Sequence, residues 1–191
     1  MNDIKIKKLS KRFGDKVVLD GLDLTLKHGE ISCIMGESGC GKSTLIKLIL
    51  GLYTPDAGEI EGVPARLSAV FQEDRLCEDF SALTNVRLAA ARGVTADQIK
   101  ADFAALGLDG NEKTPARALS GGMRRRVALI RALRADAELI ILDEPFAGLD
   151  EATHAAAAEY IKSRRKERTV IVVTHDAADA ALLGAVTVYR M

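Results

Sequence analysis

The segment of the chain best suited to chemistry is the glycine-rich loop GESGCGKS at residues 36–43. It fits the pattern G-x-x-x-x-G-K-[ST], in which glycines let successive backbone N–H groups point at phosphate oxygens. Lys42 can place its charge on the β- and γ-phosphates, and the Ser43 hydroxyl can bind Mg²⁺. A helix after the loop would add its positive end to the same anion. The predicted nucleotide-binding residues of this loop are Gly36, Glu37, Ser38, Gly39, Cys40, Gly41, Lys42, Ser43 and Thr44.

A second feature is the acidic pair Asp143 and Glu144, which follows the apolar residues 139–142. A continuous apolar run is typical of a strand covered on both faces, and ligands bind at the carboxyl edge of such sheets. We expect Asp143 to hold Mg²⁺ and Glu144 to orient and deprotonate a water that attacks the γ-phosphate. A strand that simply ends in a polar turn at Pro145 is the alternative, and the phosphate loop upstream argues against it.

A third feature is the segment LSGGM at residues 119–123. Ser120 is a good N-cap for the helical pattern that continues to Ala135. Its hydroxyl and the backbone of Gly121 and Gly122 would make another anion site at a helix start. Taken by itself, the segment favours a glycine-rich helix cap that binds no ligand.

Hydrophobic periodicity predicts the elements that must position these residues. Residues 4–9 and 17–26 alternate as half-buried strands do, with Asp20-Gly21 as a turn or bulge. Residues 31–35 form a short apolar strand that runs into the phosphate loop. Further strands are expected at 58–70 (one or two), 139–142, 169–173 and 186–189, and helices at 42–50, 84–108 with a break near Gly93, 120–135, 151–166 and just before the last strand. The pattern is an antiparallel start followed by α/β, with a helical insert in the middle.

Composition sets limits on the class of protein. The 191 residues suffice for one compact domain, with 48% apolar and 28% charged residues. The 27 basic and 27 acidic residues balance, which does not suggest a broad nucleic-acid surface. Three cysteines predict a reducing compartment rather than a disulfide framework. We expect no secretory signal and no membrane-spanning run of roughly eighteen apolar residues.

The sequence resembles that of the ATP-binding cassette (ABC) ATPases, specifically the ATP-hydrolysing subunit of an ABC transporter. The resemblance rests on three features in this order: the phosphate loop, the LSGGM segment and the strand that ends in Asp-Glu. The usual segment of that family is Leu-Ser-Gly-Gly-Gln, so Met123 departs at the last position. The resemblance covers about residues 4–190 and implies an α/β fold: a P-loop NTPase core, an N-terminal antiparallel β subdomain and a helical subdomain. Residues 1–75 and 136–191 would form the core and the β part, and residues 76–135 the helical subdomain.

The resemblance also implies roles for single residues. Phe13 would stack on adenine, and Gln72 would be the Q-loop glutamine that reaches Mg²⁺ and links to the membrane partner. Asp150, in the sequence AGLD, would contact the opposite subunit, and His175 would be the switch histidine that contacts the γ-phosphate. The implied catalytic residues are Lys42, Glu144 and His175, and the implied metal-binding residues are Ser43, Gln72 and Asp143.

The family works as a head-to-tail pair with two ATP molecules in the shared interface. Each ATP would lie between the phosphate loop of one subunit and Ser120, Gly121 and Gly122 of the other. The resemblance therefore implies a homodimer, or a pair with a second cassette, together with transmembrane permease subunits. The chain would be cytoplasmic and bound to the inner face of the membrane through that permease. An isolated monomer would hydrolyse ATP poorly.

Several kinds of ABC protein compete. Three classes fit the sequence poorly. Chromosome and repair ATPases carry a long coiled coil between the phosphate loop and the Asp-Glu strand, and the segment between these two features is too short for one here. Ribosomal ABC proteins carry two cassettes where this sequence has one, and fused exporters carry membrane helices that this sequence does not predict. Met123 followed by arginine, the run VFQEDRL at 70–76 and Asn85-Val86 are similar to nitrate, sulfonate and taurine importers. The departure is CEDF at 77–80, where those importers tend to have Pro-Trp. A separately encoded exporter cassette is the alternative, and a soluble non-transport ABC ATPase is a third.

The remaining charged features are expected to be structural. The arginines of the helix expected at 120–135 would form a solvated face with ion pairs, so no nucleic-acid partner is predicted. His28 and His154 match no motif and are expected at the surface. The arginines concerned are Arg124, Arg125, Arg126, Arg131 and Arg134.

Overall fold

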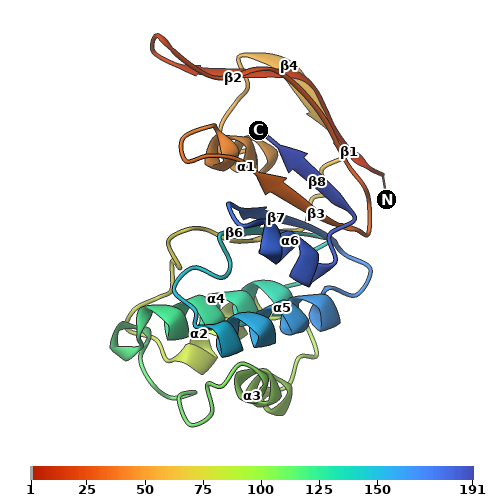
Figure 1. Ribbon diagram of the computed structural model, residues 1–191. Coiled ribbons are helices and arrows are strands. Elements are labelled where there is room, and N and C mark those ends of the chain that lie inside the picture. Colours follow the sequence, from red (N-terminus) through yellow and green to blue (C-terminus); the bar gives the residue numbers. More distant parts are fainter. Residues whose placement is uncertain (1) are drawn as a thin grey trace.

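Two β-sheets form the frame of the protein in the computed structural model, which describes residues 2–191 (Figure 1). The smaller sheet is antiparallel, with the order β2 (Lys16–Leu26), β1 (Ile4–Phe13), β4 (Ala57–Glu61). The register of β1 and β2 shifts near Gly21, which has φ +62° and donates its N–H to Ser10 Oγ at 2.9 Å. The predicted irregularity at Asp20-Gly21 is therefore a β-bulge within one long strand.

The larger sheet is parallel throughout, with the strand order β5-β6-β7-β3-β8. Its strands are β5 (Leu67–Val70), β6 (Leu139–Asp143), β7 (Thr169–Thr174), β3 (Ile31–Met35) and β8 (Thr187–Arg190). The region expected to hold one or two strands at 58–70 holds two, and each belongs to a different sheet. Gly62, which has φ +78°, lies between them, where the chain leaves one sheet for the other.

Helices cover both faces of the parallel sheet (Figure 1). The helix α1 lies between the two sheets, and α4, α5 and α6 cover the opposite face. The helices α2 and α3 lie beyond α4, and the break near Gly93 falls between them as predicted. Their bounds are α1 Lys42–Ile49, α2 Ala82–Ala89, α3 Ala96–Ala105, α4 Gly121–Arg134, α5 Glu151–Arg165 and α6 Ala177–Leu183, with a 3₁₀ turn, η1, at Ala116–Ala118. None of the helices described is long and apolar enough to cross a bilayer.

Alternate residues of the central strands feed two separate cores. Ile140 and Leu142 of β6 face the cluster under α4 and α5, whereas Leu139 and Ile141 face the cluster that contains α1 and β1. Because successive strand residues point to opposite faces, a strand covered on both sides must be apolar throughout. This explains why β6 is fully buried, including Asp143 at its end. The α/β fold with an antiparallel and a parallel sheet is confirmed.

The arginines of α4 are not the solvated face expected from the sequence. Arg125 is only 5% exposed, and Arg126, Arg131 and Arg134 are half-buried. Arg134 and Arg164 of α5 both donate to Asp102 of α3, whose side chain is fully buried; the Arg164 contact is 2.7 Å. Arg124, which pairs with Glu78 at 3.3 Å, behaves as predicted. The guanidinium groups instead satisfy groups on neighbouring segments, because α4 lies at the centre of this part of the molecule.

We predict that Asp102→Ala destabilises the fold by about 3 kcal/mol, since removing one member of a buried ion pair leaves the other unpaired. The free energy of unfolding in urea measures this. The matched control is Asp97→Ala, which removes an exposed acid from the same helix and should cost about 0.5 kcal/mol or less. Equal losses for the two variants would contradict the prediction.

Candidate active site

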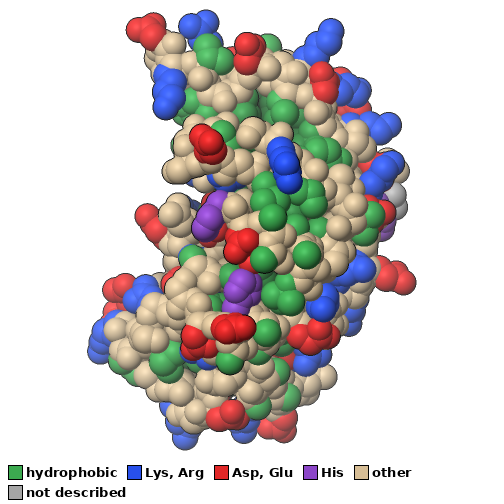
Figure 2. Space-filling view, viewed as in Figure 1, with side chains coloured by type: hydrophobic (Ala, Val, Ile, Leu, Met, Phe, Trp, Pro, Cys, Tyr) green, Lys and Arg blue, Asp and Glu red, His purple; other side chains and the backbone are tan. Residues whose placement is uncertain are grey.

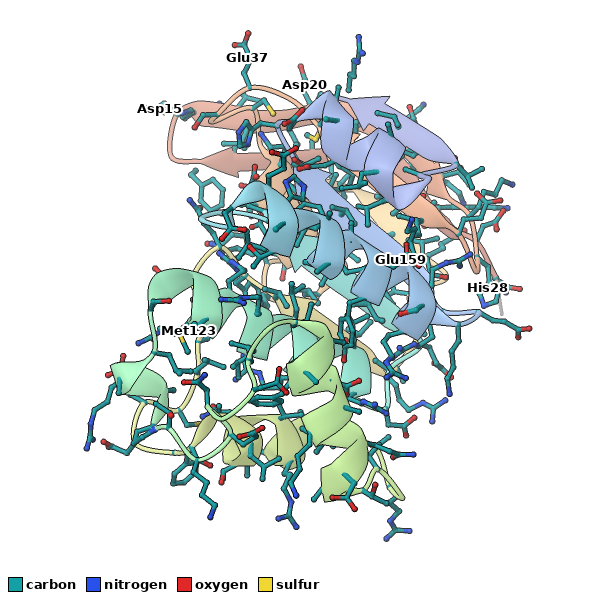
Figure 3. The ribbon with its side chains drawn as sticks, turned by 60° about the horizontal axis from the view of Figure 1, so that its bottom comes forward. Asp15, Asp20, His28, Glu37, Met123 and Glu159 are labelled. Atoms are coloured by element: carbon teal, nitrogen blue, oxygen red, sulfur yellow. The ribbon has the colours of Figure 1, made fainter. Side chains whose placement is uncertain are left out.

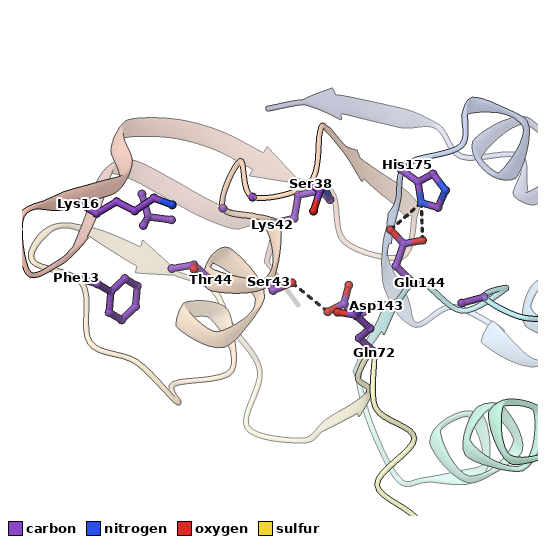
Figure 4. A pocket seen from close by; sticks show the side chains of 14 residues that line it. Phe13, Lys16, Ser38, Lys42, Ser43, Thr44, Gln72, Asp143, Glu144 and His175 are labelled. Carbon is purple, nitrogen blue, oxygen red and sulfur yellow. Dashed lines mark hydrogen bonds and ion pairs between the residues drawn. The ribbon is translucent and has the colours of Figure 1, made fainter. Parts of the chain in front are cut away.

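A pocket of about 600 Å³ lies where four parallel strands end (Figure 4). The phosphate loop follows β3, Gln72 follows β5, Glu144 follows β6, and His175 follows β7. Its walls bring together most of the residues predicted from sequence. The lining residues are Phe13, Lys16, Val18, Ser38, Gly39, Gly41, Lys42, Ser43, Thr44, Gln72, Asp143, Glu144, Ala147 and His175.

The phosphate loop owes its shape to two glycines in the left-handed region, Gly39 (φ +87°) and Gly41 (φ +109°). Gly41 also approaches the antiparallel sheet closely. A Cβ added there would lie 2.9 Å from Leu19 Cδ2 and 3.0 Å from the Val18 carbonyl oxygen. Glycine is therefore required at Gly41 for both its conformation and its packing, and the loop can present backbone N–H groups to an anion.

Lys42 lies inside the curve of the loop. Its Nζ donates to the carbonyl oxygens of Gly36 at 2.6 Å and Glu37 at 2.8 Å, which holds the ammonium group at the pocket floor. Gly36, Glu37 and Cys40 belong to the loop but do not line the pocket. The Glu37 side chain points away from the molecule (Figure 3), and Cys40 Sγ lies 3.9 Å from Lys42 Nζ.

Ser43 and Asp143 meet across the pocket, where Ser43 Oγ donates to Asp143 Oδ2 at 3.4 Å (Figure 4). Burial, and then the charge of Glu144, raise the pKa of Asp143. Gln72 adds an amide to the same wall. Among the described residues, no group of three or more His, Cys, Asp or Glu side chains could enclose a metal. One buried carboxylate with a hydroxyl and an amide fits Mg²⁺, which takes few protein ligands and completes its shell with phosphates and water.

Glu144 and His175 form the most direct contact in the pocket. His175 Nδ1 lies 3.0 and 3.1 Å from the two Glu144 carboxylate oxygens. This hydrogen bond, and then the charge of Glu144, raise the pKa of His175. Glu144 has φ +51°, which is strained for a side chain with a Cβ, and its N–H donates to Val173 O at 2.9 Å. A strained backbone therefore points this carboxylate at the imidazole.

The outer wall of the pocket is aromatic and apolar. Phe13 is 43% exposed, and its ring meets the edge of Tyr53 with centroids 5.4 Å apart. Lys16 and Val18 line the pocket beside it, and sequence reasoning missed both of them. Phe13 pairs with Lys16 across the β1–β2 turn, so a predicted hairpin register would have found Lys16 and the next residue on its face, Val18. Ala147 was also missed as a lining residue, although it is the first residue of the AGLD segment that contains Asp150.

Besides Gly36, Glu37 and Cys40, four more predicted nucleotide contacts lie outside this pocket: Ser120, Gly121, Gly122 and Asp150. Ser120 is exposed and caps α4, accepting from Met123 N at 3.3 Å. A Cβ on Gly122 would lie 3.0 Å from the Gly148 carbonyl oxygen, so the start of α4 packs tightly on the loop before α5. Asp150 caps α5 by accepting from Thr153 N at 2.9 Å, and this hydrogen bond lowers the pKa of Asp150.

The backbone around Gln72 is held by α4. Arg125 donates to the Phe71 carbonyl oxygen at 2.6 Å and to the Gln72 carbonyl oxygen, and its guanidinium lies 3.2 Å from the Asp74 carboxylate. Arg131 donates to the Asp74 carbonyl oxygen at 2.9 Å. The helix that begins at Ser120 therefore holds the segment that delivers Gln72 to the pocket.

Comparisons with known proteins show the family and the fold of the chain. The family model described as "ABC transporter" matches residues 19–147. An aliphatic sulfonates import ATP-binding protein of Paraburkholderia xenovorans is 42% identical over 95% of this chain and 74% of its own length. A second protein of that name, from Nocardia farcinica, is 43% identical over 95% of this chain and 75% of its own. The solved structure of an ATP-binding subunit of an ABC transporter, at 26% identity, has a TM-score of 0.82 over 94% of this chain and 82% of that one.

We predict that alkylation of Cys40 blocks ATP hydrolysis and that ATP protects against it, because an adduct on Sγ must displace Gly36 or Lys42. Cys77 is exposed and Cys33 buried, so the labelling belongs in a Cys77→Ser background. The same reagent should leave a Cys40→Ala, Cys77→Ser protein active. Full turnover after complete labelling of Cys40, measured by mass spectrometry, would contradict the prediction.

We predict that Asp143→Asn stabilises the nucleotide-free protein at pH 7 while removing its stabilisation by Mg²⁺-ATP. The pKa of Asp143 is higher in the folded state than in the unfolded state, where it is about 3.9. Above that pH the ionised carboxylate therefore opposes folding, and replacing it with an amide should stabilise the protein. Below that pH the carboxyl is protonated in both states, so the difference in stability between variant and wild type should vanish. Thermal unfolding from pH 3 to 8, with and without Mg²⁺-ATP, measures both effects. A lower melting temperature for the nucleotide-free variant than for the wild type at pH 7 would contradict the prediction that the ionised Asp143 carboxylate opposes folding.

Proposed function

The chain belongs to the ABC transporter family as an ATP-hydrolysing subunit, and on that premise we propose that the pocket of Figure 4 uses Mg²⁺-ATP to drive import of a small solute through a separate permease. One observation supports this most strongly. The phosphate loop, Asp143 and the Glu144–His175 pair converge at one edge of the sheet although they are far apart in sequence. That arrangement fits a triphosphate whose last phosphoryl group is attacked by water.

Binding would begin with the triphosphate in the phosphate loop. Backbone N–H groups of the loop and the Lys42 ammonium would take the negative charge, and the start of α1 would add its dipole. Mg²⁺, held by Ser43, Asp143 and Gln72, would supply positive charge at the β- and γ-phosphates. Phe13 would stack on the adenine, with Lys16 and Val18 closing the other side of that wall.

Hydrolysis would then depend on Glu144 and His175. Glu144 would orient a water and accept its proton as the oxygen attacks the γ-phosphorus. The bond from the γ-phosphorus to the bridging oxygen breaks, and ADP keeps that electron pair. His175 lies 3.0 Å from the Glu144 carboxylate and would contact a γ-phosphate oxygen. Lys42 would stabilise the charge that develops on the leaving side.

The complete site would contain a second cassette. Ser120, Gly121 and Gly122 form an exposed helix start outside the pocket of their own chain. We propose that they meet the γ-phosphate of an ATP in a head-to-tail partner, and that Asp150 contacts the same partner. The partner is a second copy or a related cassette. ATP would favour the closed pair because its γ-phosphate completes both halves, and hydrolysis would release it.

We propose that residues 76–135 act as a helical subdomain that docks on the permease at the inner face of the membrane. Phe80 and Leu88 are 47% and 62% exposed there. The buried Asn85 shapes this surface. Its side-chain oxygen accepts a hydrogen bond from Cys77 N at 2.8 Å, and its side-chain nitrogen donates to the carbonyl oxygens of Cys77, Phe80 and Ser81. The relatives' names support an organic sulfonate or a similar small oxyanion as the imported solute.

We predict that Glu144→Gln binds ATP but lowers kcat by about 100-fold or more, because the amide cannot accept a proton from water. The variant should accumulate as an ATP-bound dimer, seen by light scattering after gel filtration with Mg²⁺-ATP. The matched control is Glu151→Gln, an exposed acid of α5, which should keep wild-type turnover. Unchanged turnover in Glu144→Gln would overturn the assignment of the base.

A further inference from the structure

His154, expected at the surface, is half-buried behind the pocket. Its ring stacks on Phe146, with centroids 4.3 Å apart and an angle of 30° between the rings. Phe146 is 7% exposed and lies two residues after Glu144. His154 therefore packs on the loop that carries the Glu144 carboxylate. Figure 2 shows that histidine and acidic side chains lie beside one another on one face of the molecule.

The other side of the same imidazole contacts the segment that carries His175. His154 Nε2 lies 2.8 Å from Asp179 Oδ1, and Asp179 is only 5% exposed. The second oxygen of that carboxylate accepts from Thr174 Oγ1, and Thr174 immediately precedes His175. Thr174 Oγ1 in turn accepts from Asp176 N at 3.1 Å. A chain of contacts therefore runs from Phe146 through His154 and Asp179 to Thr174.

These contacts join the two loops whose side chains meet in the pocket. Glu144 has a strained backbone at φ +51°, which persists only where neighbouring structure holds it. His175 is largely exposed, with 77% of its side chain open to solvent, so its own packing restrains it little. The 3.0 Å contact between Glu144 and His175 thus depends on how their two loops are held from behind.

We propose that His154 is a positioning residue for ATP hydrolysis, which holds the Glu144 loop through Phe146 and the His175 segment through Asp179. The proposal depends on the proposed function of Glu144 and His175. Misplacement of catalytic groups by about 1 Å can cost as much as 100-fold in rate, so even a modest loosening of this link should be measurable in kcat.

Three substitutions separate the two contacts. His154→Phe keeps the stacking and loses the polar contact, His154→Ala loses both, and His154→Arg offers a flat cation that can stack on Phe146 and pair with Asp179. We expect kcat to fall about tenfold in the Phe and Ala variants with the Kd for ATP unchanged, and to recover largely in the Arg variant. His28→Gln, far from this cluster in the fold, is the matched control and should retain wild-type kcat.

A spectroscopic readout distinguishes positioning from mere stability. The chain has only three histidines, so the imidazole resonances of His175 can be assigned and titrated by NMR. Glu144 raises the pKa of His175, and Glu144→Gln supplies the reference for loss of that contact. In His154→Phe and His154→Ala the pKa of His175 should move towards the value in that reference. Asp179→Asn is unsuitable for this arm, since the charges of Asp179 and Asp176 act on His175 directly.

Two results would overturn the inference. The first is wild-type kcat in His154→Ala and His154→Phe. The second is a lower kcat with the pKa of His175 unchanged, which would show that His154 only stabilises the fold. If the His154→Ala variant unfolds, the His154→Phe variant still gives this measurement, because phenylalanine is similar in size to histidine. If instead the proposed role of Glu144 is wrong, Glu144→Gln would retain wild-type turnover, whatever the effect of the His154 variants on kcat.

Discussion

Parallel pairing in register is the constraint on which the rest of this structure depends. Met35 of β3 is level with Thr174 of β7, and Asp143 of β6 is level with Val173 of the same strand. The residues that follow these strands must therefore leave the sheet at one edge. Burial of the strands on both faces makes this register costly to change, because a slip by one residue would exchange the two cores. The pocket is thus a consequence of how the sheet pairs.

The residues at that edge are individually unfavourable to the folded state. Burial raises the pKa of Asp143, and Glu144 has a left-handed backbone. Such features persist where the surrounding structure is stable enough to impose them. Here the surrounding structure is the apolar sheet, fully buried in β3, β6 and β7. The site can therefore keep a buried ionisable group because the sheet below it supplies the stability.

The loops of the pocket are held from behind by side chains of the helices under the sheet. Arg125 and Arg131 of α4 hold the backbone around Gln72, and His154 of α5 lies between the loop after Glu144 and the segment before His175. Each of these residues reaches more than one neighbour. The helices consequently act as the support that fixes the geometry of these loops.

Local patterns in the sequence determined much of this protein. The phosphate loop, the N-cap at Ser120, the buried strand before Asp143 and the break at Gly93 each depend on residues close together in the chain, where periodicity and capping are legible. Only the tertiary structure decided that Lys16 and Val18 line the pocket, that the arginines of α4 bind neighbouring segments, and that His154 lies between Phe146 and Asp179. The physical reason is that these contacts join residues distant in sequence, and their partners are chosen by packing. The segment 119–123 shows both sides: its residues predict a helix start, and the close packing of Gly122 on the Gly148 carbonyl oxygen appears only in the fold.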